Sequence, residues 1–330
     1  MSRKEYNPSI SMIRLLAMML IISCHICQYY DSEWAWWLNI GVQIFFILSG
    51  FLYGGKEIKE PIKWLGRQFK KILIRYYIFL LIAIGLYIIF APNILSIGSI
   101  ISSFFCVGVI KGIGHLWFVG YILFCYLITP YLSQLSSYLD KININRSIFI
   151  VLSLICICSV IGVLTHSYFR PGRIMCYIAG FFISYFYKRA GGGVIYVCLL
   201  LSFVLAALTN IVFCFMKYFK GLSMNGILSN ITDYSHLSLG LFITLGLMII
   251  LRKIKDIYIL KISDKYSYEI YLVHQLFILS PFTLMGISDY VSLNIVFTLL
   301  AIIISGFLLH VLSTSILSFN GLGLFKRRHP

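Results

Sequence analysis

Charged side chains are scarce in this sequence: Asp, Glu, Lys and Arg make up 12% of its 330 residues, and only 11 residues are acidic. A typical soluble domain has about 25% charged and about 45–50% apolar residues, whereas 60% of the residues here are hydrophobic. This composition excludes an ordinary soluble enzyme, a disordered chain and a nucleic-acid-binding domain. Because one helical span needs roughly 20 apolar residues, we expect a single integral membrane domain over residues 1–330.

The hydropathy pattern predicts an all-α, polytopic membrane helix bundle with about ten transmembrane helices. The expected spans are 10–29, 37–54, 72–91, 115–135, 148–165, 174–187, 194–213, 235–251, 268–284 and 291–312. With the N-terminus inside the cell, most of the 27 Lys and Arg residues fall in cytoplasmic segments, including those near both ends of the chain. The positive-inside rule therefore predicts that both termini are cytoplasmic. The net charge of +16 then reflects topology, and no nucleic-acid partner is expected.

Sequence patterns for metal and phosphate sites are missing. Most of the nine cysteines lie within apolar stretches, as small buried hydrophobes do, and not in polar loops. Cys24 and Cys27 form a C-x-x-C pair, but the histidine that haem attachment needs does not follow it, and further zinc ligands are not evident. A Walker A loop and a G-x-S-x-G nucleophile elbow are also absent from the sequence. We expect no metal.

Two ionisable residues lie in the first expected span. Arg14 and His25 are eleven residues apart, which is about 20° more than three helical turns and about 16 Å along the axis. They therefore share one helix face, with Arg14 at the cytoplasmic end and His25 in the outer half. Ionisable groups inside spans are costly and are functional candidates by default. The alternative is a snorkelling arginine and a hydrogen-bonded core histidine.

The basic connection that enters the third span is a second candidate site. Lys71 and Arg75 lie near the expected depth of Arg14, where they could bind a polyanion such as a nucleotide pyrophosphate. The alternative is the cytoplasmic collar of positive charge that the positive-inside rule describes.

Two further clusters combine histidine with aromatic residues. His115 and Trp117 open the fourth span, where they could stack on and hydrogen-bond a sugar ring or form an interfacial aromatic belt. Ser267, Tyr271 and His274 follow a helical spacing of four and three, so they share one face of the ninth span. Glu269 points elsewhere, and we expect it to neutralise a neighbouring arginine. For this second cluster, packing in the interior of the bundle is the alternative to function.

In this order the motifs resemble those of the acyltransferase-3 family of integral membrane acyltransferases, which includes bacterial surface-polysaccharide O-acetyltransferases. The matching features are an R-x10-H (Arg14, His25), a G-x-x-x-F-F-x-L-S-G-F (Gly41 to Phe51), an H-L-W-F (His115 to Phe118), an S-Y-x-I-Y-L-x-H (Ser267 to His274) and, more weakly, Arg173. The chain departs from many relatives at the entry to the third span, where Lys71 and Arg75 stand in place of R-x-x-R. A fused extracytoplasmic hydrolase-like domain is not expected, because 330 residues leave no room for one.

The resemblance implies a membrane O-acyltransferase, most often an O-acetyltransferase, in the bacterial inner membrane. The donor would be cytoplasmic acetyl-CoA, and the acceptor a hydroxyl of a cell-surface polysaccharide or its lipid-linked or glycoside precursor. Arg14 and His25 would be catalytic, with His25 as general base or as acyl carrier. Arg14, Lys71 and Arg75 would hold the donor. The expected acceptor-binding residues are His115, Trp117, Tyr271 and His274.

Two points stay open in the sequence. Asp31 or Glu33, just beyond the first span, could orient His25 as the acid of a triad does. Interior Arg and His residues would also suit a flippase or transporter for a lipid-linked sugar, although no pair of broken helices marks a transporter site in the two halves. The oligomeric state leaves no sequence signal.

Overall fold

A computed structural model describes residues 7–165, 172–219 and 227–325, and all regular secondary structure in these ranges is helical. Arg3, Lys4 and Lys326–Arg328, which contribute to the expected orientation of the termini, lie outside the described ranges. The chain divides into two compact units. Unit 1 comprises Met1–Ile21, Trp36–Pro61 and Cys125–Leu260, and unit 2 comprises Ile22–Ala35, Ile62–Phe124 and Lys261–Pro330.

Eight helical segments in the described ranges are long and apolar enough to cross a membrane. They are Pro8–Tyr29, Trp34–Phe51, Pro61–Phe90, Gly114–Leu139, Ile144–Gly162, Gly193–Tyr218, Leu228–Lys253 and Val291–Leu317. The expectation of a multi-pass all-α membrane protein is thereby confirmed. The remaining two expected spans fall on helices α8 (Gly172–Ala190) and α11 (Tyr258–Ile278), in which every stretch of 18 residues contains three or more charged residues. The count of ten and the placement of the termini stay predictions.

Some helices extend beyond their expected boundaries. Helix α4 (Pro61–Phe90) begins well before residue 72, and α11 begins before residue 268 and ends at Ile278. Backbone hydrogen bonds within a helix do not depend on apolar side chains, so both helices continue through stretches that carry several charged residues. Hydropathy marks only the apolar part of such a helix.

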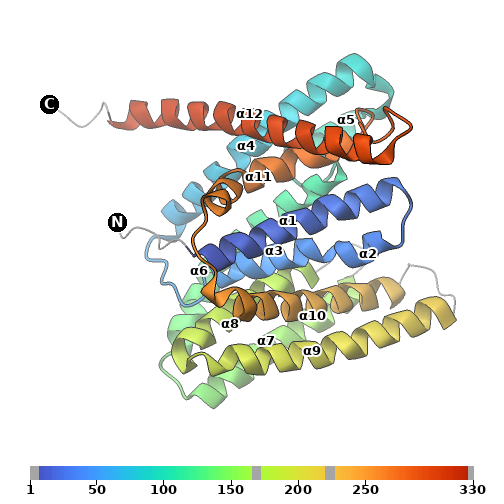
Figure 1. Ribbon diagram of the computed structural model, residues 1–330. Coiled ribbons are helices and arrows are strands. Elements are labelled where there is room, and N and C mark those ends of the chain that lie inside the picture. The colour runs from blue at the N-terminus through green and yellow to red at the C-terminus, as the bar shows by residue number, and fades with distance from the viewer. Residues whose placement is uncertain (1–6, 166–171, 220–226, 326–330) are drawn as a thin grey trace. The chain divides into compact units, whose positions relative to one another are not determined.

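Glycine sets the packing of unit 1, which contains α3 (Ile40–Phe51), α7 (Ile144–Thr165), α8, α9 (Gly193–Cys214) and α10 (Ile227–Ile250). A side chain at Gly50 of α3 would overlap the backbone carbonyl of Tyr177 in α8, and one at Gly180 would overlap the carbonyl of Ile47. Helices that approach this closely need small residues at the contact. Helices α9 and α10 also run side by side (Figure 1). The glycines of the second-span motif therefore have a packing role.

Unit 2 contains α4, α5 (Ile97–Phe104), most of α11, and α12 (Val291–Phe325). Gly306 lets α12 pack closely on α11 at Ile270. The Tyr76 hydroxyl of α4 donates a 2.5 Å hydrogen bond to the carbonyl of Ser103 in α5. Helices α1 (Pro8–Tyr29) and α6 (Trp117–Leu139) contribute residues to both units. His25 lies in the part of α1 that belongs to unit 2.

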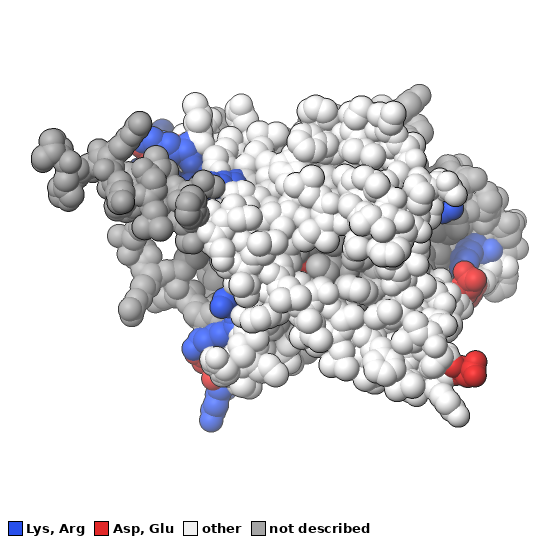
Figure 2. Space-filling model, turned by 90° about the horizontal axis from the view of Figure 1, so that it is seen from above, with Lys and Arg blue, Asp and Glu red and all other residues white. Residues whose placement is uncertain are grey.

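Charged side chains are scarce on the face shown in Figure 2. Lys, Arg, Asp and Glu cover little of its visible described surface, and most of that surface is uncharged. Hydrocarbon excludes charge, so this distribution agrees with a chain that crosses a membrane several times.

Candidate active site in unit 2

Three histidines from distant parts of the sequence meet in unit 2. His25 comes from α1, His115 from the short 3-10 helix η2 (Gly114–Leu116) and His274 from α11. The ring centroid of His274 lies 5.1 Å from that of His25 and 4.6 Å from that of His115. We call these three residues the imidazole cluster. The structure thus brings together residues that three separate motifs singled out.

The ring of His25 is oriented by a glutamine one helical turn away. His25 Nδ1 lies 2.7 Å from Gln28 Oε1. An amide oxygen only accepts hydrogen bonds, so with this amide orientation Nδ1 carries the proton and Nε2 keeps its lone pair. A second contact, from Gln275 Nε2 to the same Nδ1, is 3.4 Å long and too weak to decide the tautomer. Gln28, and not Asp31 or Glu33, thus makes the hydrogen bond that orients the ring of His25.

The backbone and both ring nitrogens of His115 contact residues of α11. Its backbone N–H donates to Gln275 Oε1 at 2.8 Å, its Nδ1 lies 2.8 Å from the same oxygen, and its Nε2 lies 2.9 Å from the carbonyl of Leu272. The Tyr271 hydroxyl donates to the carbonyl of His115 at 2.5 Å. The side chain is buried. This geometry makes His115 a residue that positions α11 and Gln275.

Tyr271 and His274 share the buried face of α11, as their spacing predicts. His274 Nδ1 lies 2.5 Å from the carbonyl of Tyr271, so Nδ1 donates to this carbonyl. His274 Nε2 is buried and has no hydrogen-bond partner in the described part of the chain. An unpaired polar atom in a buried site is rare in proteins and calls for an explanation.

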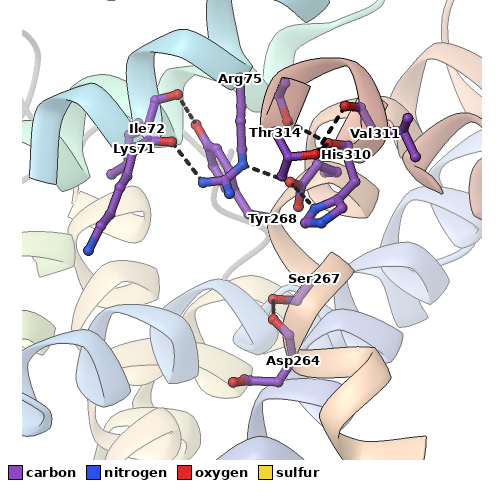
Figure 3. Close-up of polar contacts among 11 residues, drawn as sticks. Lys71, Ile72, Arg75, Asp264, Ser267, Tyr268, His310, Val311 and Thr314 are labelled. Carbon is purple, nitrogen blue, oxygen red and sulfur yellow. Dashed lines mark hydrogen bonds and ion pairs between the residues drawn. The ribbon is translucent and has the colours of Figure 1, made fainter. Parts of the chain in front are cut away.

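A second polar network in unit 2 is built on Glu269. One carboxylate oxygen, Oε1, lies 2.7 Å from Arg75 Nε and 2.7 Å from His310 Nδ1. Figure 3 shows the side chains of Arg75 from α4 and His310 from α12 pointing toward one another, and both contact the carboxylate of Glu269. The expectation that Glu269 neutralises an arginine is confirmed. Arg75 also donates from Nη1 to the carbonyl of Lys71 at 2.9 Å.

Comparison with known proteins gives the same family that the sequence motifs resemble. The model of the acyltransferase-3 family, described as an acyltransferase domain, matches residues 7–317. The chain belongs to this family. One relative is the peptidoglycan O-acetyltransferase OatA of Listeria monocytogenes serovar 1/2a. It is 30% identical to this chain over 127 residues, which are 35% of the chain. The match covers 19% of OatA. No solved structure matches the chain.

The basic residues that the sequence predicts to bind the acyl donor are divided between the two units. Lys71 and Arg75 lie on α4 in unit 2; Lys71 is exposed, and Arg75 is largely buried. Arg14 lies in the part of α1 that belongs to unit 1, where its charge interacts with the phenols of Tyr53 and Tyr126. Trp117 is half-buried, and its ring contacts that of Tyr121 at 5.4 Å.

The structure places three residues at these sites that the sequence analysis did not predict. Gln28 and Gln275 hold the imidazole cluster, and His310 bonds to Glu269. The sequence signal for Gln28 was its position one turn after His25. His310 is an ionisable residue in the last span, which by default marks a candidate. Among the described residues, no group of His, Cys, Asp and Glu side chains could hold a metal ion.

Proposed function

We propose that this protein is an O-acyltransferase of the bacterial inner membrane that moves an acyl group, most often acetyl, from cytoplasmic acyl-CoA to a carbohydrate hydroxyl. The observation that carries the proposal is the imidazole cluster in a chain of this family. His25 Nε2, with Nδ1–H held by Gln28, is the reacting nitrogen. OatA, a peptidoglycan O-acetyltransferase by name, supports a sugar polymer of the cell surface, or its precursor, as the class of acceptor.

The donor binds at the basic residues on the cytoplasmic side. The phosphates of CoA are too anionic to enter hydrocarbon, so they stay at the membrane surface near the exposed Lys71. Arg75 is fixed by Glu269, which gives the cytoplasmic end of α4 a preorganised guanidinium. Arg14 shares a face of α1 with His25 and is assigned to the pantetheine arm. A thin arm between helices would also keep the thioester away from water.

The acceptor binds near the outer ends of the helices. Trp117 is half-buried at the start of α6, where its ring can stack on a sugar. Tyr271 and His274 are the further acceptor-binding residues, and His115 fixes the position of their helix. The partners of the protein are then acyl-CoA, a carbohydrate and the bilayer, with both termini in the cytoplasm.

Surface glycan from matched strains tests the proposal. We would compare a host that expresses the wild-type protein with one that expresses His25→Ala, at equal expression and membrane insertion, and count O-acyl esters by NMR. We expect the esters to vanish while glycan amount and chain length stay unchanged. His236→Gln, a buried histidine of unit 1, is the matched control and should retain the esters. Persisting esters with glycan trapped inside the cell would instead indicate a flippase or transporter.

A further inference from the structure

We infer that His274 is a second catalytic residue, the base that takes the proton of the acceptor hydroxyl, and that His25 carries the acyl group. This inference rests on the proposed function and assigns its two chemical steps to two different nitrogens. It follows from the hydrogen bonds of the imidazole cluster in unit 2.

The tautomers of the two rings are fixed in the same sense. Nδ1 of His25 donates to Gln28 Oε1 at 2.7 Å, and Nδ1 of His274 donates to the carbonyl of Tyr271 at 2.5 Å. A neutral imidazole has one N–H and one lone pair, so each ring keeps its lone pair on Nε2. In the described part of the chain neither Nε2 has a hydrogen-bond partner.

The third ring of the cluster cannot serve as a base in this arrangement. Both ring nitrogens of His115 lie within 2.9 Å of an oxygen acceptor, Gln275 Oε1 or the carbonyl of Leu272. Because both nitrogens face these oxygens, the ring would have to turn away from one of them before a nitrogen could take a proton from a substrate hydroxyl. Only His25 and His274, whose centroids are 5.1 Å apart, offer lone pairs ready for chemistry.

Exposure separates the roles of these two residues. His274 is completely buried, whereas His25 is only partly buried and lies on the helix face that leads to Arg14. A donor arm that follows α1 therefore reaches His25 first. A buried, unpaired nitrogen is costly for a fold to keep, and a hydrogen bond from the acceptor hydroxyl would satisfy it.

The reaction then has two steps, acylation of His25 and transfer of the acyl group to the acceptor. His25 Nε2 attacks the thioester carbonyl, a C–N bond forms, the C–S bond breaks and CoA leaves as a thiolate. The ring keeps Nδ1–H, so acyl-His25 is cationic and activated. The acceptor oxygen then attacks the acyl carbon, the C–N electron pair returns to His25, and His274 Nε2 takes the hydroxyl proton. His274 then releases this proton to water, which balances the proton that the departed thiolate takes up, so that the products are the ester and free CoA.

Substitution of His274 by asparagine separates a base from a structural residue. Asparagine keeps an N–H donor near the position of Nδ1, and so a bond to the carbonyl of Tyr271, but it has no basic nitrogen. The purified full-length protein is mixed with acetyl-CoA labelled in the acetyl group, first without acceptor. Polysaccharide from a host strain that lacks this chain is then added. Size-exclusion profiles and thermal unfolding establish that each variant is folded.

We expect wild type and His274→Asn to release a burst of up to one thiol per protein and to retain the label. On addition of polysaccharide, transfer by His274→Asn should be at least about 100-fold slower than by wild type, the lower limit for loss of a general base. His25→Ala should show neither burst nor label. If His274→Asn does not fold, His274→Gln, which also lacks a base, takes its place with the same expectation.

The inference is overturned if folded His274→Asn transfers the label within threefold of the wild-type rate, or if it forms no labelled protein. A different result would contradict the proposed function itself, namely wild-type protein that releases no thiol and transfers no label.

Discussion

Arg75 and Glu269 form a buried ion pair between α4 and α11, with 2.7 Å between Arg75 Nε and Glu269 Oε1. The carboxylate is 1% exposed and also bonds to His310. A charged residue in a membrane-embedded site is costly unless it is paired. The pair therefore explains how α11 can carry a buried carboxylate, and how the guanidinium of Arg75 is held in a single position.

Breaking this pair should destabilise the protein. Arg75→Leu leaves Glu269 with His310 alone, and removal of one partner of a buried pair costs roughly 3–5 kcal/mol. The Arg75→Leu/Glu269→Leu double variant should recover part of that loss, because no charge is left unpaired. Thermal unfolding in detergent measures both. The exposed pair of Lys59 and Glu57 is the control, and Lys59→Ala should cause no measurable change. An Arg75→Leu variant as stable as wild type would refute the role of the pair.

The contact between α3 and α8 gives a second prediction. A methyl group at Gly50 would overlap the carbonyl of Tyr177, so Gly50→Ala should lower stability by about 1–3 kcal/mol or more, as overpacking does. Apart from the neighbouring residues and backbone of its own helix, no atom lies within 4 Å of a Cβ added at Gly85 of α4. Gly85→Ala should therefore be neutral or stabilise the helix by about 0.5–1 kcal/mol. Equal effects of the two substitutions, measured by thermal unfolding, would contradict the close approach.

Binding of the donor can be tested at Lys71. This side chain is exposed, and we expect it to attract the phosphates of CoA, so Lys71→Ala should raise KM for acetyl-CoA about 3–10-fold with little change in kcat, an effect of one exposed charge. The difference from wild type should shrink as salt increases. Lys63→Ala, at another exposed position of α4, is the control. A fall in kcat without a change in KM would contradict a role of Lys71 in binding the donor.

The orientation of His25 gives a fourth prediction. Gln28→Leu removes the acceptor of the Nδ1–H bond, so the ring loses its fixed tautomer. We expect kcat to fall by about 10–100-fold, the range seen when the partner that orients a metal-bound histidine is removed. KM for acetyl-CoA should stay unchanged. Gln28→Glu keeps an acceptor oxygen and should be closer to wild type; if it is as impaired as Gln28→Leu, the hydrogen bond is not what matters.

The sequence predicts more of the fold than of the site. Apolar runs have a direct physical cause in hydrocarbon, so a multi-pass helical protein could be predicted, as could the shared face of Tyr271 and His274. Helix boundaries could not, because α4 and α11 continue through charged stretches where hydropathy carries no signal.

Contacts between distant segments were also beyond sequence reasoning. The pairing of Glu269 with an arginine could be expected from charge alone, but its bond to His310, 41 residues away, depends on how α11 and α12 pack. The tautomers of His25 and His274 likewise follow from Gln28 and from a backbone carbonyl. A motif names the residue types, whereas these bonds set which nitrogen can react.

Acyl transfer by purified protein tests the central claim most directly. Wild type and His25→Ala are reconstituted in lipid nanodiscs, shown to have the same thermal stability, and supplied with labelled acetyl-CoA and polysaccharide from a host that lacks the chain. We predict that wild type moves the label to the polysaccharide and that His25→Ala lowers kcat/KM by at least about 100-fold. Transfer by His25→Ala within a few-fold of wild type would contradict the account.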